Sequence, residues 1–322
     1  MDEAPPRVGL VLGAGGVAGG AFHAGVLAAL EQATGWDPRR ASVVVGTSAG
    51  SITGTSLRAG LSTADGLARV VGRVMSPEGN RLMGKVGPLR RPPPLRPVRQ
   101  GRPPAQLAAT LARAAARPFS ARPWALVAGL MPEGAISTDL ISSGIGALFP
   151  SEWPPEPLWV CAVRQSDGRR VVFGKDHRSA LADAVAASCA IPGFFSPVMI
   201  DGEAYIDGGV HSPTNADVLG DADLDLVLVS SPMSLSGRGL RLATDQAVRR
   251  WSGMLLDGEA LRLRRRGMPV VAFQPTADDV KIMGVNAMDA SRRTAIADQA
   301  RESTLRRLAR TDTRARLAPL LR

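Results

Sequence analysis

The stretch LVLGAGGVAGGAFHAGVLAAL, residues Leu10–Leu30, carries no formal charge, and the fold expected for the chain depends on how this stretch is interpreted. Six of its residues are glycines, and all six lie between Gly13 and Gly25. The pattern fits an apolar strand at Val8–Leu12, a glycine-rich turn and a helix from Gly19 to Glu31. Three interpretations compete: a membrane span, a dinucleotide-binding loop and a catalytic loop that requires bare backbone.

A membrane span is the least favoured of the three. The stretch is long enough to cross a bilayer, but six glycines cost about 1 kcal/mol each relative to alanine inside a helix. His23 also lies in the middle of the run. The N-terminus, MDEAPPRVG, is acidic and proline-rich and does not resemble a signal peptide. The two cysteines, Cys161 and Cys189, are too few for a disulfide framework. We therefore expect a cytoplasmic protein.

A dinucleotide-binding loop is a stronger rival, because Gly13-Ala14-Gly15 begins a GxG motif after a strand. That fingerprint also requires an acidic residue about 20 positions later, at the end of the second strand. The second predicted strand, Ser42–Gly46, offers no carboxylate there. A nucleotide-dependent oxidoreductase remains a lesser alternative.

The second strand leads instead into Gly46-Thr47-Ser48-Ala49-Gly50, a GxSxG motif followed by a helix of small residues. In this context the serine sits on a sharp strand-to-helix turn, and the flanking glycines let neighbouring backbone approach. The N-terminus of the helix favours developing negative charge. The motif predicts a nucleophilic Ser48 on an elbow formed with Gly46 and Gly50, and a plain tight turn is the alternative.

A hydrolytic serine needs a base. In the order serine, acid, histidine the base would be His211, but nothing else recommends that residue, and a position in a loop or at a rim is favoured. A carboxylate serves if it accepts the serine proton directly. Asp207 in YIDGGV is the best candidate, because it ends a predicted hairpin strand and is followed by Gly208 and Gly209.

Four blocks follow one another along the chain: LGAGGVAGGAFHAGVLAALE, GTSAGSI, AASCAIPGFFSPV around Pro192, and YIDGGV. Together they resemble the patatin-like phospholipase family, over roughly two-thirds of the chain. The resemblance implies a three-layer α/β/α fold with a mostly parallel central sheet. It also implies a Ser48–Asp207 dyad that hydrolyses acyl esters of lipids without a metal or a cofactor.

By the same resemblance, the glycine-rich block is an oxyanion loop containing Gly13, Gly15, Gly16 and Gly19. Backbone N–H groups of Gly15, Gly16 and their neighbours would bind the tetrahedral intermediate. Such a donor is worth roughly 3–4 kcal/mol in comparable hydrolases. The family usually has Arg or Lys just before the last glycine of this loop, where this chain has Ala18. A lipid- or partner-binding protein of this family with weak or lost activity is therefore the alternative function.

The net charge of +10 comes from one segment. Residues 79–132 contain ten basic residues and no acidic one, whereas the rest of the chain has 29 of each sign. The segment is rich in proline and arginine, and its basic stretch from Arg81 to Arg117 has no interleaved aromatic residue to stack on bases. It favours contact with an anionic membrane surface, helped by Trp124, over binding to nucleic acid. A solvated basic loop without a partner is the alternative.

The remaining pattern predicts one domain over residues 1–322, with an insertion at about 79–132 and a helical C-terminal part at about 236–322. Strands alternate with helices, which is typical of a mostly parallel sheet covered on both faces. Asp201-Gly202 predicts a two-residue hairpin turn. Further strands are expected at 158–164, 169–174, 224–230 and 268–273, and further helices at 47–60, 137–149, 179–190, 240–263 and 286–309.

Overall fold

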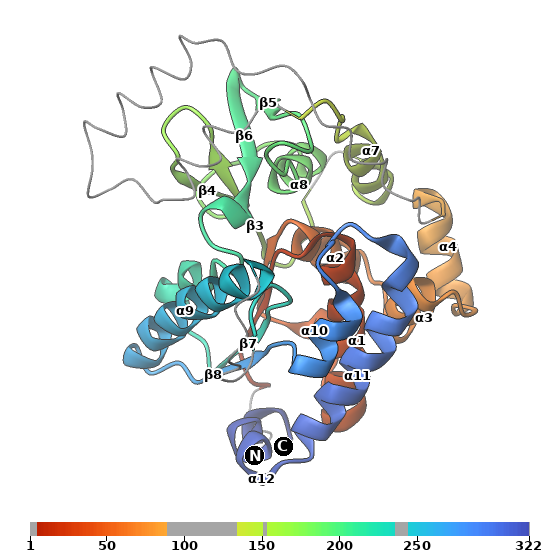
Figure 1. Cartoon of the computed structure of the whole chain (residues 1–322), viewed down its shortest axis with the longest axis vertical. Helices are drawn as coiled ribbons and strands as arrows, with labels where there is room; N and C mark the ends of the chain where they lie inside the picture. Colours follow the sequence, from red (N-terminus) through yellow and green to blue (C-terminus); the bar gives the residue numbers. More distant parts are fainter. Residues whose placement is uncertain (1–4, 89–133, 151–152, 236–243, 322) are drawn as a thin grey trace.

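The computed structural model describes residues 5–88, 134–150, 153–235 and 244–321. Its centre is an eight-stranded sheet in the order β5-β6-β3-β2-β1-β7-β8, with β4 paired to β3 off this path (Figure 1). The strands are β1 (Val8–Leu12), β2 (Val43–Thr47), β3 (Leu158–Arg164), β4 (Arg170–Phe173), β5 (Val198–Ile200), β6 (Glu203–Asp207), β7 (Leu226–Ser230) and β8 (Val270–Phe273).

The sheet is parallel at its centre and antiparallel toward the β5 edge. Strands β3, β2, β1, β7 and β8 pair in parallel, in that order. Antiparallel pairs join β3 to β4, β3 to β6 and β5 to β6. The β5–β6 hairpin turns at Asp201-Gly202, where both residues have positive φ, of 50° and 79°. This geometry confirms the predicted two-residue turn.

Helices cover both faces of the sheet. On one face a core of buried aliphatic and aromatic residues joins the sheet to α1, α2, α8 and α11, and on the other a second core joins it to α9. The arrangement is the predicted three-layer α/β/α fold. The helices are α1 (Gly16–Thr34), α2 (Ala49–Arg58), α3 (Thr63–Val71), α4 (Pro77–Val86), α7 (Asp139–Leu148), α8 (Leu181–Ser188), α9 (Thr244–Arg265), α10 (Ala277–Met283), α11 (Arg293–Leu308) and α12 (Thr311–Arg316).

Several element boundaries differ from those expected from the sequence. Helix α1 begins at Gly16, three residues before the predicted start, so the second half of the glycine-rich stretch belongs to the helix. Helix α11 begins at Arg293 and not at residue 286. Most of the predicted insertion, including Trp124, lies outside the described residues, and its first part forms α4. In the described ranges no helix has the length and apolarity needed to span a bilayer.

Candidate active site

Ser48 occupies the turn between β2 and α2 with a strained backbone. Its φ of 53° and ψ of −122° are rare for a residue with a side chain, and such strain persists only where neighbours fix it. Gly46 and Gly50 make the turn possible. A Cβ on Gly46 would lie 2.4 Å from Ser51 Cα, and a Cβ on Gly50 would lie 1.9 Å from the Leu12 carbonyl oxygen. The GxSxG motif is therefore a close-packed elbow that presents the Ser48 side chain.

Two other serines hold this elbow in place. The Ser188 hydroxyl accepts a hydrogen bond from the Ser48 N–H at 2.9 Å and donates one to the Cys161 carbonyl at 2.6 Å. The Ser51 hydroxyl donates to the Ser48 carbonyl at 2.7 Å. The backbone on both sides of the Ser48 side chain is thus anchored, to β3 through Ser188 and to α2 through Ser51.

Asp207 ends β6 and meets the Ser48 side chain. The Asp207 side chain is buried, with 5% of the residue exposed. Burial raises the pKa of its carboxyl to about 6, while a hydrogen bond from Ser48 and one from the Gly209 N–H lower it. The Gly209 bond is 2.7 Å long. Gly208 lies so close to the Cys161 carbonyl that a Cβ would be 2.2 Å from its oxygen. Gly208 and Gly209 thus allow the Asp207 carboxyl to lie close to β3 and to Ser48.

In the glycine-rich turn some backbone N–H groups form hydrogen bonds that stabilise the turn, and others have no acceptor among the described residues. Gly13 N–H donates to the Ser230 carbonyl at 3.0 Å, and Gly19 N–H donates to the Gly15 carbonyl at 2.7 Å. Among the described residues no acceptor is found for the N–H groups of Gly15, Gly16 and Val17. Gly13 and Gly19 therefore have structural bonds, whereas the first turn of α1 presents bare donors next to Ser48.

The position that departs from the family pattern, Ala18, is 2% exposed. Its N–H donates to the Ala287 carbonyl at 2.9 Å. The same carbonyl oxygen lies 2.9 Å from the place where a Cβ on Gly16 would be. The segment before α11 therefore packs directly on the glycine-rich turn and fixes its backbone.

His23 holds the glycine-rich turn from below, a role that its sequence context did not reveal. Its ring is fully buried, and its nitrogens lie 2.8 Å from the Ser230 hydroxyl and 2.8 Å from the Gly13 carbonyl. Burial lowers its pKa to about 4, although the Gly13 bond raises it. A neutral imidazole thus fixes the carbonyl of Gly13 at neutral pH.

Asn215 joins the two halves of the candidate dyad, although nothing in its local sequence marks it for this role. Its side-chain NH₂ lies 3.1 Å from the Thr47 hydroxyl, next to Ser48, and 3.3 Å from the carbonyl of Gly208, next to Asp207. The residue has left-handed backbone, with φ 53° and ψ 29°, which asparagine tolerates better than most residues. His211, by contrast, is half-buried at the end of a short 3₁₀ helix and does not line the pocket at Ser48.

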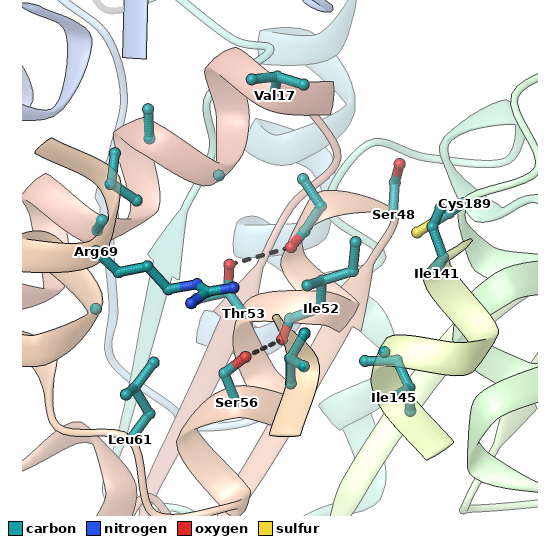
Figure 2. A pocket seen from close by; sticks show the side chains of 18 of the residues that line it. Val17, Ser48, Ile52, Thr53, Ser56, Leu61, Arg69, Ile141, Ile145 and Cys189 are labelled. Atoms are coloured by element: carbon teal, nitrogen blue, oxygen red, sulfur yellow. Dashed lines mark hydrogen bonds between the residues drawn. The ribbon is translucent and has the colours of Figure 1, made fainter. Parts of the chain in front are cut away.

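A cavity of about 580 Å³ opens beside Ser48 and extends between α1, α2, α3, α4 and α7. Ser48 and Gly16 both line this Ser48 pocket. Leu61 and Arg69 also line it, on the side away from Ser48 (Figure 2). Its walls are mainly aliphatic, with contributions from Val17, Leu27, Ile52, Leu61, Ile141 and Ile145. Cys189 lies beside Ser48, and burial raises the pKa of its thiol. The pocket has the shape and polarity of a site for an apolar chain.

Comparison with known proteins identifies the family of this chain. A family model described as Patatin-like phospholipase matches residues 10–219, which include Ser48, Asp207 and the glycine-rich turn. The chain therefore belongs to the patatin-like phospholipase family, and this membership supports a lipid hydrolase.

Solved structures similar to this chain include VipD and the type III effector protein ExoU. VipD from Legionella pneumophila is 15% identical, with a TM-score of 0.42, and the match covers 95% of this chain and 67% of that one. The type III effector ExoU is 18% identical, with a TM-score of 0.38, and the match covers 99% of this chain and 54% of that one. This chain thus spans about half the length of ExoU.

Proposed function

We propose that this protein is a lipid acyl hydrolase that uses a Ser48–Asp207 dyad. The proposal rests on one observation: the Ser48 hydroxyl, which lines an apolar pocket, forms a hydrogen bond with the buried Asp207 carboxyl. Family membership supports the lipid substrate class. The bare N–H groups at the start of α1 supply the remaining element that acyl transfer requires.

The chemistry follows from these positions. Asp207 accepts the proton of the Ser48 hydroxyl as Oγ attacks the ester carbonyl carbon. The carbonyl oxygen becomes an oxyanion that the N–H groups of Gly15 and Gly16 stabilise. The intermediate collapses to a Ser48 ester as Asp207 returns the proton to the departing alcohol. Water then gives a proton to Asp207 and attacks the carbonyl carbon of this ester. The second intermediate collapses as Asp207 returns the proton to Ser48 Oγ, which releases the fatty acid and regenerates the Ser48 hydroxyl.

The protonation state of Asp207 suits this role. With a pKa of about 6, the carboxyl is mostly ionised at neutral pH but is a stronger base than an exposed aspartate. Its only neighbouring donors, among the residues the structure describes, are Ser48 and Gly209. A carboxylate with few hydrogen bonds is well suited to draw the proton from the hydroxyl that it contacts.

A cytoplasmic location with peripheral contact to an anionic membrane remains part of the proposal. The basic segment 79–132 motivates it. Co-sedimentation with phosphatidylglycerol vesicles at low salt, compared for the full chain and a chain lacking 89–132, tests the contact. Equal binding by both proteins would remove the segment from the proposal.

A fluorophosphonate probe tests the serine mechanism directly. We expect the wild-type protein to be labelled and to hydrolyse a short-chain p-nitrophenyl ester, whereas Ser48→Ala should lose labelling and at least roughly 10³-fold in kcat. Asp207→Asn should fold and lose most turnover. Ser42→Ala, which removes an exposed hydroxyl directly before β2 and outside the pocket, is the matched control and should still be labelled. Absence of labelling in the folded wild-type protein would favour a binding protein without activity.

A further inference from the structure

The Ser48 pocket contains a cationic region that hydrolysis of a neutral ester does not require. Arg69, Lys85 and Arg293 line it, and no aspartate or glutamate is among the described lining residues. These cations come from α3, α4 and α11, so three separate helices bring positive charge to one cavity. Aliphatic pockets for acyl chains do not gain from such charge, because burying it costs free energy.

Arg69 is the central member of this group. Its side chain is half-buried and extends across the pocket toward α2 (Figure 2). One guanidinium nitrogen donates to the Gly87 carbonyl at 2.6 Å. Burial lowers its pKa, and the nearby charge of Arg293 lowers it further. No carboxylate within the described ranges forms an ion pair with Arg69.

A half-buried guanidinium such as that of Arg69, with no carboxylate partner among the described residues, favours an anion in the cavity. We propose that Arg69, with Arg293 beside it, determines substrate specificity by binding the phosphate of a glycerophospholipid whose ester lies at Ser48. The proposal rests on the function proposed above. A guanidinium fork matches the oxygens of a phosphate and forms charge-assisted hydrogen bonds with them.

The position of Arg69 favours a phosphate over the far end of an acyl chain. In Figure 2 its side chain extends in the direction of Thr53 in α2, and Thr53 lies five residues after Ser48. Arg69 therefore faces α2, the helix that begins directly after Ser48, and a phosphate bound there can belong to the same glycerol as the ester at Ser48. The aliphatic wall of α7 then remains available to the acyl chain.

The test compares two short-chain substrates with identical acyl groups, dihexanoyl phosphatidylcholine and dihexanoylglycerol, both as monomers. The measured quantity is the ratio of kcat/KM on the phospholipid to kcat/KM on the neutral ester. We expect Arg69→Gln to lower this ratio roughly 10- to 100-fold, and Arg69→Lys to lower it less. Arg73→Gln removes the same charge from an exposed position one turn away, outside the pocket, and should leave the ratio unchanged.

Two further measurements separate the proposal from other outcomes. Arg69→Gln should still be labelled by the fluorophosphonate probe, which shows that Ser48 remains reactive in this variant. A wild-type protein without labelling or activity would refute the proposed function, and the subsite would then be tested by binding alone. Binding of dihexanoyl phosphatidylcholine to Ser48→Ala, with and without Arg69→Gln, tests the subsite without turnover. An equal fall on both substrates, an unchanged ratio, or inhibition by inorganic phosphate without any change in selectivity would overturn the proposal.

Discussion

The turn from β1 to α1 and the turn from β2 to α2 leave neighbouring parallel strands, since Leu12 and Gly46 are register partners. Both turns are rich in glycine, and both lead directly into a helix that lines the Ser48 pocket. In the second turn the residue with positive φ is Ser48, and its N–H is bonded to Ser188. In the first turn the residue with positive φ is Gly16, and its N–H has no acceptor among the described residues.

The difference lies in which group each turn presents. In the β2–α2 turn the glycines flank the strained residue, so that neighbouring backbone can pack tightly while a side chain points to the pocket. In the β1–α1 turn glycine occupies the strained position itself, so that backbone is presented in place of a side chain. In the function proposed above, one strand–turn–helix unit supplies the nucleophile and the other supplies the oxyanion donors.

The largest expected effect comes from Gly50→Ala, which disrupts the packing of the Ser48 turn. The new Cβ would lie 1.9 Å from the Leu12 carbonyl oxygen, so β1 and α2 must separate. We expect the free energy of unfolding to fall by at least about 3 kcal/mol, measured by urea denaturation. Gly146→Ala in α7 is the control, because nothing lies within 4 Å of its Cβ position. A Gly50→Ala protein as stable as this control would contradict the close-packed elbow.

A smaller effect, on activity more than on stability, is expected from Gly16→Ala. Alanine at φ 58° is strained, and its Cβ would lie 2.9 Å from the Ala287 carbonyl oxygen. The N–H donors should shift, and kcat on a p-nitrophenyl ester should fall roughly 10²-fold or more. Gly35→Ala has similar strain, at φ 71°, but lies at the far end of α1 with open space around it. If both variants lose equal activity per folded molecule, the turn does not act through its N–H groups.

Local sequence was sufficient to predict most of this arrangement. The GxSxG motif and the β-branched strand before it together specify a sharp turn, and Asp201-Gly202 specifies a hairpin that brings Asp207 to the sheet. The strand Leu158–Arg164 has the predicted bounds. These features depend on residues close together in the chain, and their backbone preferences carry the information.

Residues that act across long sequence separations could not be predicted in this way. Asn215 lies 168 residues from its partner Thr47, and His23 lies 207 residues from Ser230. Arg69 is an ordinary helical arginine in the sequence and becomes distinctive only because α11 brings Arg293 near it. Polar side chains of this kind gain their roles from the packing of separate elements, and single-sequence periodicity does not record that packing.

The smallest expected effect is a dependence of activity on pH. It distinguishes the Ser48 turn, whose side chain relies on an ionisable carboxyl, from the β1–α1 turn, which presents uncharged N–H donors. The Ser48 turn depends on Asp207, whose pKa of about 6 is raised mainly by burial, whereas His23, which holds the other turn, has a pKa of about 4 and is neutral around pH 6. Below that pH the protonated carboxyl cannot accept the Ser48 proton. We expect kcat/KM on a neutral ester to fall about tenfold per pH unit below pH 6 and to be level above it.

The same carboxyl should make the folded state less stable as pH rises. Its folded pKa of about 6 exceeds the ordinary value of 3.8, so the folded protein binds the proton more tightly than the unfolded chain does. The resulting stabilisation is full below about pH 4 and is lost as pH rises through about 6, a difference of roughly 2 to 3 kcal/mol. Asp207→Asn removes this titration. In urea denaturation it should therefore be more stable than wild type at pH 7.5, with the difference decreasing toward pH 4. A difference that is independent of pH would show that Asp207 does not titrate as a buried base, and the activity profile below pH 6 would then need another group.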